Sequence, residues 1–433
     1  MSCARGQLVA VVGAGPAGLA AACALAKRGV PHAVLEQGKP RSSRRHDAAD
    51  DLAEGVGGAG LFSDGKFSYY PSGTHLYRLS DERRLAAAYT CCLRELEAVG
   101  IATEPLPARV SNGARPDAEL KRYPSHYASL ERRLALIERL EATAERICTE
   151  EQVTSIERRE GFYALETRSG RLEATAIILA TGRFGPLALA SVLGRSMPTT
   201  PLRYELGVRI ESPSSIGFAG ELTIPDVKRI WHTNGIEART FCTCRRGEIW
   251  AIPTGGLYAL SGRADGRPTE FSNFGLLARY AGPAFASGGL VWSALSADLR
   301  AARAIYEPLE TFLGGKGVWP RAEERPWHPR ETFVPGSIRE VVGDAFHASL
   351  AAAVADLLTW SPSLCHPATT CLFPAVEGVG SYPLVGGSLR VPGHRVWCAG
   401  DVVGRFRGLV PALVSGYYAG MAAAACAMRT RPA

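Results

Sequence analysis

Gly13-Ala14-Gly15-Pro16-Ala17-Gly18 is the stretch of sequence that decides the fold. It follows a short apolar segment, Leu8 to Val12, and opens a run rich in alanine and leucine, Pro16 to Arg28, so we expect a strand, a tight turn and a helix. In this G-x-G-x-x-G pattern the first glycine makes the turn, the second lets a pyrophosphate approach the backbone, and the third lets the helix pack on the strand. His32 to Glu36 is a second expected strand, parallel to the first because such crossovers are right-handed.

Glu36 lies at the end of this second strand, 18 residues after Gly18. A carboxylate at that point can accept hydrogen bonds from an adenosine ribose and disfavours a 2′-phosphate, so FAD or NAD fits better than NADP. The cofactor-binding residues expected from this unit are Gly13, Gly15, Pro16, Ala17, Gly18 and Glu36.

A second signal lies near the C-terminal end of the sequence. Val396 to Cys398 is an apolar strand that leads into Gly400-Asp401, and an apolar helix follows from Leu409. These residues resemble the glutathione-reductase-like FAD superfamily, as do Ala180-Thr181-Gly182 after another apolar strand. The resemblance implies that Asp401 binds the ribityl chain and that the helix points its positive N-terminus at the flavin. The alternative for Asp401 is a plain helix cap. On this resemblance the further FAD-binding residues are Val153, Thr181, Gly182, Gly400, Asp401, Gly408, Leu409 and Val410.

A glycine-rich stretch from Gly55 to Lys66 is similar to a segment of the uncharacterised FAD-dependent dehydrogenases of bacteria. Shorter similarities, such as Glu205 to Glu211 and Arg239 to Cys244, spread over nearly the whole chain. The segment after Gly182 departs from that family. We expect the backbone of the glycine-rich stretch to approach the cofactor, and Lys66 to stabilise negative charge on the flavin as hydride arrives; the alternative is a structural loop with a solvated lysine. The residues concerned are Gly57, Gly58, Ala59, Gly60, Ser63, Asp64 and Lys66.

The order of elements predicts an α/β fold with a discontinuous Rossmann-type FAD-binding domain. We expect its first part at 1–200 and its last part at 375–433, with an inserted α+β substrate domain, containing a mostly antiparallel sheet, at 201–374. Helices are expected at 81–99, 127–146 and 409–428, and a β-meander at 153–174.

Composition limits the partners and the cell compartment that we expect for the protein. The formal charge of +7 is spread along 433 residues, which does not predict a nucleic-acid partner. Eleven cysteines at irregular spacing favour a reducing compartment such as the cytoplasm. We predict that the apolar run at 408–428 is a buried helix and not a membrane span, because it contains Pro411, Gly416 and Gly420. No set of ligands with zinc-like spacing is present, and Cys242 and Cys244, which would share one face of a strand, do not have the usual redox spacing.

The acid–base candidates are His232, His328, His366 and Tyr382, because hydride removal from a C–H beside an O–H or N–H needs a base. Arg203, Arg209 and Arg239 are candidates to hold a substrate carboxylate, although Arg209 alternates with apolar residues as outward strand residues do. The leading hypothesis is a dehydrogenase or oxidase that transfers hydride from a small organic, natural-product-like substrate to flavin N5, with reoxidation by oxygen or another acceptor. Two alternatives remain open: a flavin monooxygenase of an aromatic or biosynthetic intermediate that uses NAD(P)H transiently, and a flavoprotein that uses FAD structurally.

Overall fold

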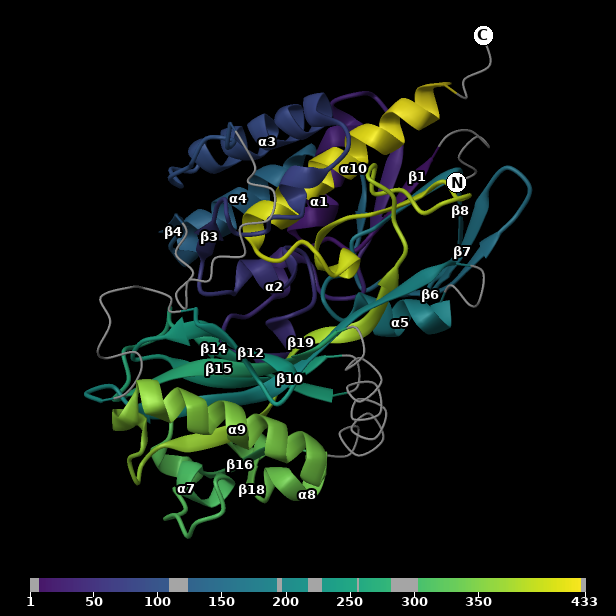
Figure 1. Cartoon of the computed structure of the whole chain (residues 1–433). Helices are drawn as coiled ribbons and strands as arrows, with labels where there is room; N and C mark the ends of the chain where they lie inside the picture. The colour runs from purple at the N-terminus through teal and green to yellow at the C-terminus, as the bar shows by residue number, and fades with distance from the viewer. Residues whose placement is uncertain are drawn as a thin grey trace. The chain divides into compact units, whose positions relative to one another are not determined.

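The computed structural model describes residues 8–108, 124–192, 197–216, 228–254, 257–281 and 303–429 (Figure 1). They belong to an α/β fold that divides into two compact units. The first unit comprises 1–112, 123–200 and 381–433, and the second comprises 113–122 and 201–380. Two of the passages of the chain from one unit to the other lie within long strands, β10 (Thr199–Pro213) and β19 (Thr370–Pro383).

The first unit is built on a five-stranded parallel sheet with the order β20-β9-β1-β2-β5. Its strands are β1 (Val9–Val12), β2 (His32–Leu35), β5 (Ile147–Cys148), β9 (Ala176–Leu179) and β20 (Val396–Cys398). The residues of β1, β2, β9 and β20 are all buried, as expected for a parallel sheet covered on both faces. The expected β-α-β unit is confirmed, since β1 pairs with β2 in parallel register and α1 (Pro16–Ala26) lies between them in sequence.

The apolar C-terminal run forms α10 (Leu409–Arg429), which lies alongside α1 (Figure 1). A Cβ atom at Gly416 would lie 2.1 Å from the carbonyl oxygen of Ala17, and one at Gly420 would lie 2.6 Å from that of Ala21. Glycine at these two positions therefore lets the two helix backbones touch. Leu413, Val414 and most of their neighbours are buried, so the prediction of a buried helix is confirmed, although α10 is also long and apolar enough to cross a membrane.

The remaining helices and strands of the first unit follow the sequence pattern closely. Asp81 and Ser129 cap the amphipathic helices α3 and α4 through their side chains, and the β-meander lies where it was predicted. Because Ser125–Tyr127 forms a strand, α4 starts later than the expected 127. The elements are α2 (Gly58–Leu61), β3 (Lys66–Ser68), α3 (Glu82–Glu97), β4 (Ser125–Tyr127), α4 (Leu130–Thr143), β6 (Val153–Arg158), β7 (Tyr163–Thr167), β8 (Gly170–Ala174) and α5 (Gly185–Val192).

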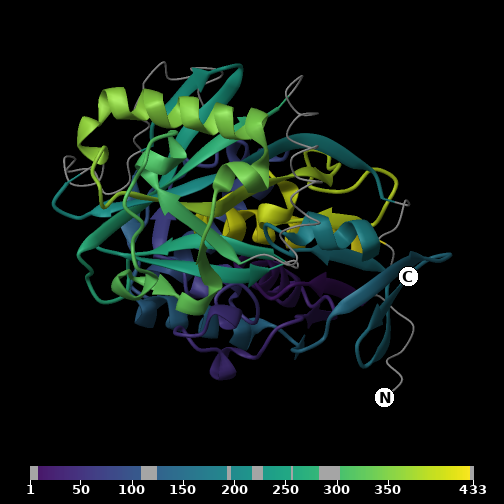
Figure 2. The same cartoon turned by 90° about the horizontal axis from the view of Figure 1, so that it is seen from below.

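The second unit contains a seven-stranded sheet with the order β11-β12-β15-β10-β19-β16-β18 and a three-stranded sheet with the order β14-β13-β17. Helix α9 (Asp344–Trp360) runs along the seven-stranded sheet and contacts β11 and β15 (Figures 1 and 2). The other elements are β11 (Ile230–Thr233), β12 (Ile236–Cys244), β13 (Glu248–Thr254), β14 (Leu257–Arg263), β15 (Phe271–Tyr280), β16 (Ala304–Pro308), α7 (Leu309–Phe312), β17 (Trp327–His328), β18 (Phe333–Pro335) and α8 (Ile338–Val342).

Arg209 on β10 corrects one expectation from the sequence. It does not point outward: its exposed fraction is 0%, and its guanidinium donates to the side chain of Asn273 at 3.0 and 2.6 Å and to the Cys242 carbonyl at 2.9 Å. The alternation along β10 is real, but the polar face is the one covered by β14, since a Cβ at Gly262 would lie 2.1 Å from the Arg209 Nη2. Alternation alone cannot show which face of a strand is covered.

The Cys242–Cys244 pair also departs from the simple strand pattern. The register of β12 shifts between Phe241 and Cys244, and Cys242 has a φ of +48°. The two sulfur atoms are 4.0 Å apart and are not bonded to each other.

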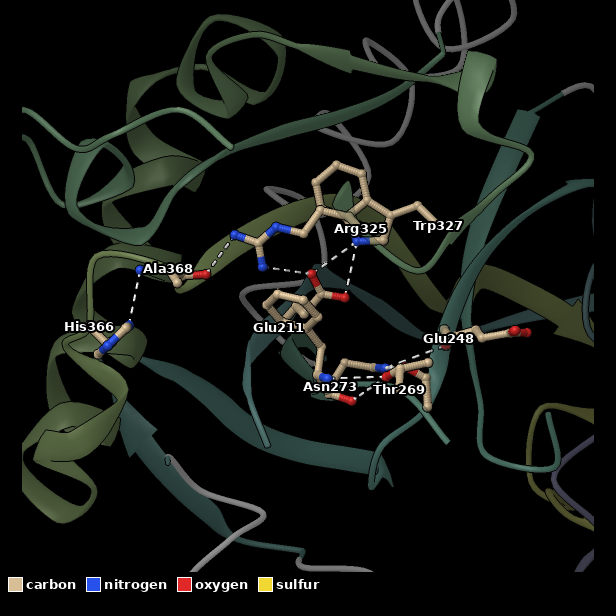
Figure 3. A network of polar contacts seen from close by, with 10 residues as sticks. Glu211, Glu248, Thr269, Asn273, Arg325, Trp327, His366 and Ala368 are labelled. Carbon is tan, nitrogen blue, oxygen red and sulfur yellow. Dashed lines mark hydrogen bonds and ion pairs between the residues drawn. The ribbon is translucent and has the colours of Figure 1, made fainter. Parts of the chain in front are cut away.

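Glu211 lies on the same face of β10 and forms a buried polar network. Figure 3 shows its carboxylate facing Arg325, whose Nη1 donates at 3.2 Å, and Trp327, whose indole N–H lies 3.1 Å from both oxygens. Burial raises the pKa of Glu211 to about 7, although Arg325 and Trp327 favour the ionised form.

This pKa predicts a pH dependence of stability. The carboxyl takes up its proton near pH 4.5 when free and near pH 7 when folded, so the folded protein binds more protons between these values and becomes less stable as the pH rises through them. We expect the midpoint of unfolding, followed by tryptophan fluorescence, to fall over this window in the native protein and to fall less in Glu211→Gln. Parallel profiles for the two proteins would show that Glu211 is ionised throughout.

Candidate functional site

The carboxyl ends of four parallel strands gather the sequence motifs at one edge of the first unit's sheet. The loop 13–18 follows β1, Glu36 follows β2, Thr181 and Gly182 follow β9, and Gly400-Asp401 follow β20. In open parallel sheets, ligands bind outside this edge. The structure therefore brings together motifs that lie almost 390 residues apart in the chain.

The three glycines of the first loop behave differently from one another. A Cβ atom at Gly13, which has a φ of +102°, would lie 2.5 Å from the Ala180 carbonyl oxygen, and one at Gly18 would lie 1.8 Å from the Gly13 carbonyl oxygen. These two glycines are required by the fold itself. Gly15 is different, because the nearest atom to its added Cβ is the Gly58 Cα at 3.8 Å. Among the residues that the structure describes, no neighbour explains why Gly15 lacks a side chain, and a ligand that approaches its backbone would explain it.

Helix α1 starts at this loop without a side-chain cap. Gly15 occupies the N-cap position, Pro16 follows it, and the first turn has no acidic residue. The first N–H groups of a helix have no partner within the helix and attract anions. The N-terminus of α1 is therefore suited to a pyrophosphate.

The Glu36 carboxylate joins the two glycine-rich loops. Its Oε2 accepts from the Ala14 N–H at 2.7 Å, and its Oε1 accepts from the N–H groups of Gly38 at 2.9 Å and Gly55 at 3.0 Å. A carboxylate has about four acceptor sites. One site thus remains for a ribose hydroxyl, while the other three hold the backbone.

Arg44 also holds the glycine-rich loop 55–60. Its buried guanidinium donates to the backbone carbonyls of Asp51, at 2.5 and 3.1 Å, Val56, at 2.7 Å, and Gly58, at 3.0 Å. The loop residues 55–60 repeat the G-x-G-x-x-G spacing, but no strand precedes them and only the four-residue helix α2 follows. They are therefore not a second dinucleotide unit.

Helix α2 brings three of the motifs into direct contact. A Cβ atom at Gly60 would lie 2.8 Å from Pro16 and 2.6 Å from Leu409, the first residues of α1 and α10. The Gly57 N–H donates to the Ala14 carbonyl at 2.8 Å. Ala59 lies on the same turn, and Val410, the second residue of α10, is fully buried.

A short 3₁₀ turn, Gly400–Val403, carries Asp401. It is held on both sides, since the Gly400 N–H donates to the Ser415 hydroxyl at 2.9 Å and the Asp401 carbonyl accepts from Gly404 at 2.9 Å. The ring of Tyr382 is buried against Gly404, where a Cβ would approach it to 2.6 Å. Gly408, with a φ of +100°, then leads into α10.

Thr181 and Val153 complete the site expected from the sequence. The Thr181 hydroxyl is buried and makes no hydrogen bond among the described residues, while Gly182 has a φ of +71° and no neighbour within 4 Å of an added Cβ. Val153 begins β6, just after Glu151, whose N–H donates to the Glu36 carbonyl at 2.8 Å.

The catalytic candidates fall into two groups. Lys66 starts β3 opposite Tyr127, and its N–H donates to the Asp64 carboxylate at 3.3 Å. The Ser63 hydroxyl donates to the Gly60 carbonyl at 2.9 Å, so Ser63, Asp64 and Lys66 continue from α2. His366 belongs to the second unit, is exposed, and accepts the Ala368 N–H through its Nδ1 at 3.1 Å.

Sequence reasoning missed Arg44 and Arg133. Arg133 is buried on α4, and its guanidinium donates to the Ser63 carbonyl. Both residues lie in charged stretches typical of exposed segments. The available signal was the glycine-rich stretch itself, whose backbone carbonyls need donors wherever the loop is buried.

The comparisons with known proteins identify the cofactor. Residues 9–56 match the family model described as FAD binding domain, so FAD is the cofactor and the chain is a flavoprotein. Three observations fit this cofactor. Helix α1 has no side-chain cap, the space around Gly15 is open, and the buried Thr181 hydroxyl has no hydrogen-bond partner among the described residues. No curated protein matches the chain.

Several solved flavoprotein structures are similar to the chain. They include CabE, an aromatic hydroxylase from angucycline biosynthesis (13% identity, 99% of this chain and 64% of that one, TM-score 0.42). Others are CmlS, a flavin-dependent halogenase (12%, 99% and 59%, TM-score 0.43), and a flavoprotein/dehydrogenase from Cytophaga hutchinsonii (14%, 98% and 80%, TM-score 0.39). The chain thus spans less than two thirds of the length of the hydroxylase and the halogenase. Similarity at this level does not assign an activity or a substrate.

Asp401 can be tested directly. We expect Asp401→Ala to weaken FAD binding about ten- to hundredfold or to shift the reduction potential, because a charged group that binds the cofactor contributes about 1.5–3 kcal/mol. Absorbance, affinity and potential should be measured together, with the exposed Asp356→Ala as the control. An Asp401 variant that only unfolds more easily, with all three flavin properties unchanged, would identify Asp401 as a helix cap.

Proposed function

We propose that the protein is an FAD-dependent dehydrogenase or oxidase that removes hydride from a small organic substrate. FAD supplies the hydride acceptor at its N5 atom and passes the electrons to oxygen or another acceptor. We further propose that the first unit binds FAD and that the second unit binds the substrate.

The observation that carries this proposal is the presence of one dinucleotide-binding sheet. Among the described residues, the five-stranded sheet of the first unit is the only wholly parallel one, and it carries the G-x-G-x-x-G loop after a strand. Both sheets of the second unit contain antiparallel pairs. A nicotinamide nucleotide therefore has no domain of its own in this part of the chain, which favours reduction of the flavin by the substrate itself.

The proposed roles of the residues follow from their positions. The backbone at Gly15 and the N-terminus of α1 bind the pyrophosphate, while Glu36 binds the adenosine ribose and Asp401 the ribityl chain. Lys66, held half-buried by β3, provides positive charge where the reduced cofactor becomes negative. Tyr382, buried beside the Asp401 turn, is the acid–base candidate in the same unit; Asp64 and His366 remain candidates from the sequence.

Anaerobic reduction of the purified yellow protein tests the proposed function. We expect NADH and NADPH to leave the flavin absorbance unchanged and an organic substrate, found from a panel, to bleach it. Readmission of oxygen then shows whether oxygen is the acceptor. Rapid bleaching by a nicotinamide would overturn the dehydrogenase proposal and support a monooxygenase of an aromatic or biosynthetic intermediate.

A further inference from the structure

Three arginine side chains of the second unit converge on one oxygen atom of a buried glutamate. The Glu205 Oε1 lies 3.1 Å from the Arg203 Nε, 2.7 Å from the Arg239 Nη2 and 2.5 Å from the Arg279 Nε. Glu205 itself is fully buried. With Glu237, which lies 2.8 Å from the Arg279 Nη1, these residues form what we call the arginine cluster.

The seven-stranded sheet creates this cluster by its register. Glu205 on β10 is directly opposite Arg279 on β15, and Arg279 is opposite Glu237 on β12. Arg203 and Arg239 lie two residues along from Glu205 and Glu237, on the same face, because side chains of a strand alternate with a period of two. Neighbouring strands thus place the charges side by side.

Arg239 is the most deeply buried arginine of the cluster. It is buried, its partner carboxylate is shared with two other guanidinium groups, and its Nε has no hydrogen-bond partner among the described residues. Burial and the neighbouring charges of Arg279 and Arg203 lower the pKa of Arg239 to about 10. A buried cation that shares its counter-charge is costly unless another anion is present.

We propose that the arginine cluster binds a carboxylate group of the small-molecule substrate. The assignment rests on the proposed function insofar as the ligand is the substrate. Guanidinium groups match the planar geometry of a carboxylate. A carboxylate is favoured over a phosphate because Glu205 and Glu237 would repel a dianion more strongly. The side chains of Arg279, Glu237 and Arg203 are 27%, 21% and 17% exposed, which gives a ligand a route to the cluster.

Titration of the FAD-loaded protein with acetate, acetamide and inorganic phosphate at fixed ionic strength tests this assignment. We expect acetate to raise the unfolding midpoint of the second unit's tryptophan signal, and acetamide to leave it unchanged. Arg279 is partly exposed, so we expect Arg279→Gln to fold. This variant should bind acetate about tenfold more weakly, as the loss of one charged hydrogen bond implies. Arg246→Gln, which removes an exposed arginine of the same unit, should keep it.

Glu205→Gln separates a ligand site from an ion-pair network that is only structural. Removal of the shared carboxylate leaves three cations close together, so this variant should be less stable than the native protein and should gain more from acetate. A variant that is destabilised to the same degree with and without acetate would overturn the proposal. So would an acetate effect that survives in Arg279→Gln, or a larger effect of phosphate than of acetate.

The readout keeps this inference distinct from the proposed function. Flavin absorbance reports on the first unit. The second unit holds every tryptophan except Trp397, so the tryptophan signal reports mainly on that unit, and its anion dependence reports on the cluster. Protein that responds to acetate but is reduced by nicotinamide alone would contradict the dehydrogenase proposal and leave the carboxylate site standing. Protein that is reduced by an uncharged substrate and does not respond to acetate would contradict the carboxylate site and leave the dehydrogenase proposal standing.

Discussion

Gly15→Val is expected to yield a folded protein that has lost its flavin. The added side chain would start where the nearest protein atom is 3.8 Å away, so the apoprotein has room for its Cβ. The pyrophosphate needs the same space. Overpacking of about 1–3 kcal/mol, together with lost backbone hydrogen bonds, should weaken FAD binding about a hundredfold. The measurement is the ratio of flavin to protein after purification, with circular dichroism to confirm the fold.

Two further variants interpret this result. At Gly386 the nearest atom to an added Cβ is also 3.8 Å away, so Gly386→Val is a matched control in the same unit and should purify yellow. At Gly18 the added Cβ would overlap the Gly13 carbonyl, so Gly18→Val should fail to fold. If Gly15→Val retained FAD at the native ratio, the pyrophosphate would have to bind elsewhere.

The sequence predicted the elements of the first unit well because their signals are local. A strand, a glycine turn and a helix lie within 20 residues around Gly15, and the buried strands β9 and β20 are continuous apolar runs. The capped helices α3 and α4 were predicted to within a few residues. The predicted cofactor, FAD, is confirmed by the FAD binding domain model that matches residues 9–56.

Contacts between distant segments were not predictable in the same way. Nothing near Arg44 indicates that it reaches the carbonyl of Gly58, and nothing near Arg209 indicates that β14 covers it. The convergence of Arg203, Arg239 and Arg279 depends on the order of strands in the sheet, which the hydrophobic pattern does not determine. Arg209 was expected to point outward from its strand, as most charged residues do, and it is buried.

Arg44→Met is expected to damage both stability and flavin binding, although Arg44 is only a positioning residue. Methionine keeps the apolar stem of the side chain but leaves the buried carbonyls of Asp51, Val56 and Gly58 without their donor. Leaving a buried acceptor without its donor typically costs about 1–3 kcal/mol. The glycine-rich loop 55–60 would then lose its contacts with Arg44, while Glu36 still held the Gly55 N–H and the Ala14 carbonyl still held the Gly57 N–H. We expect a lower unfolding midpoint and a reduced flavin ratio in the same preparation.

The neighbouring arginine provides the control for this experiment. Arg45 is exposed and pairs with Asp47 on the surface, so Arg45→Met should change neither property measurably. Saturating FAD should restore part of the lost stability of Arg44→Met, because FAD binds only the folded loop and shifts the equilibrium by mass action. A lysine at position 44 should recover part of the flavin ratio, since its ammonium can donate to some of the same carbonyls. An Arg44→Met protein as stable and as yellow as Arg45→Met would mean that the loop is held without Arg44.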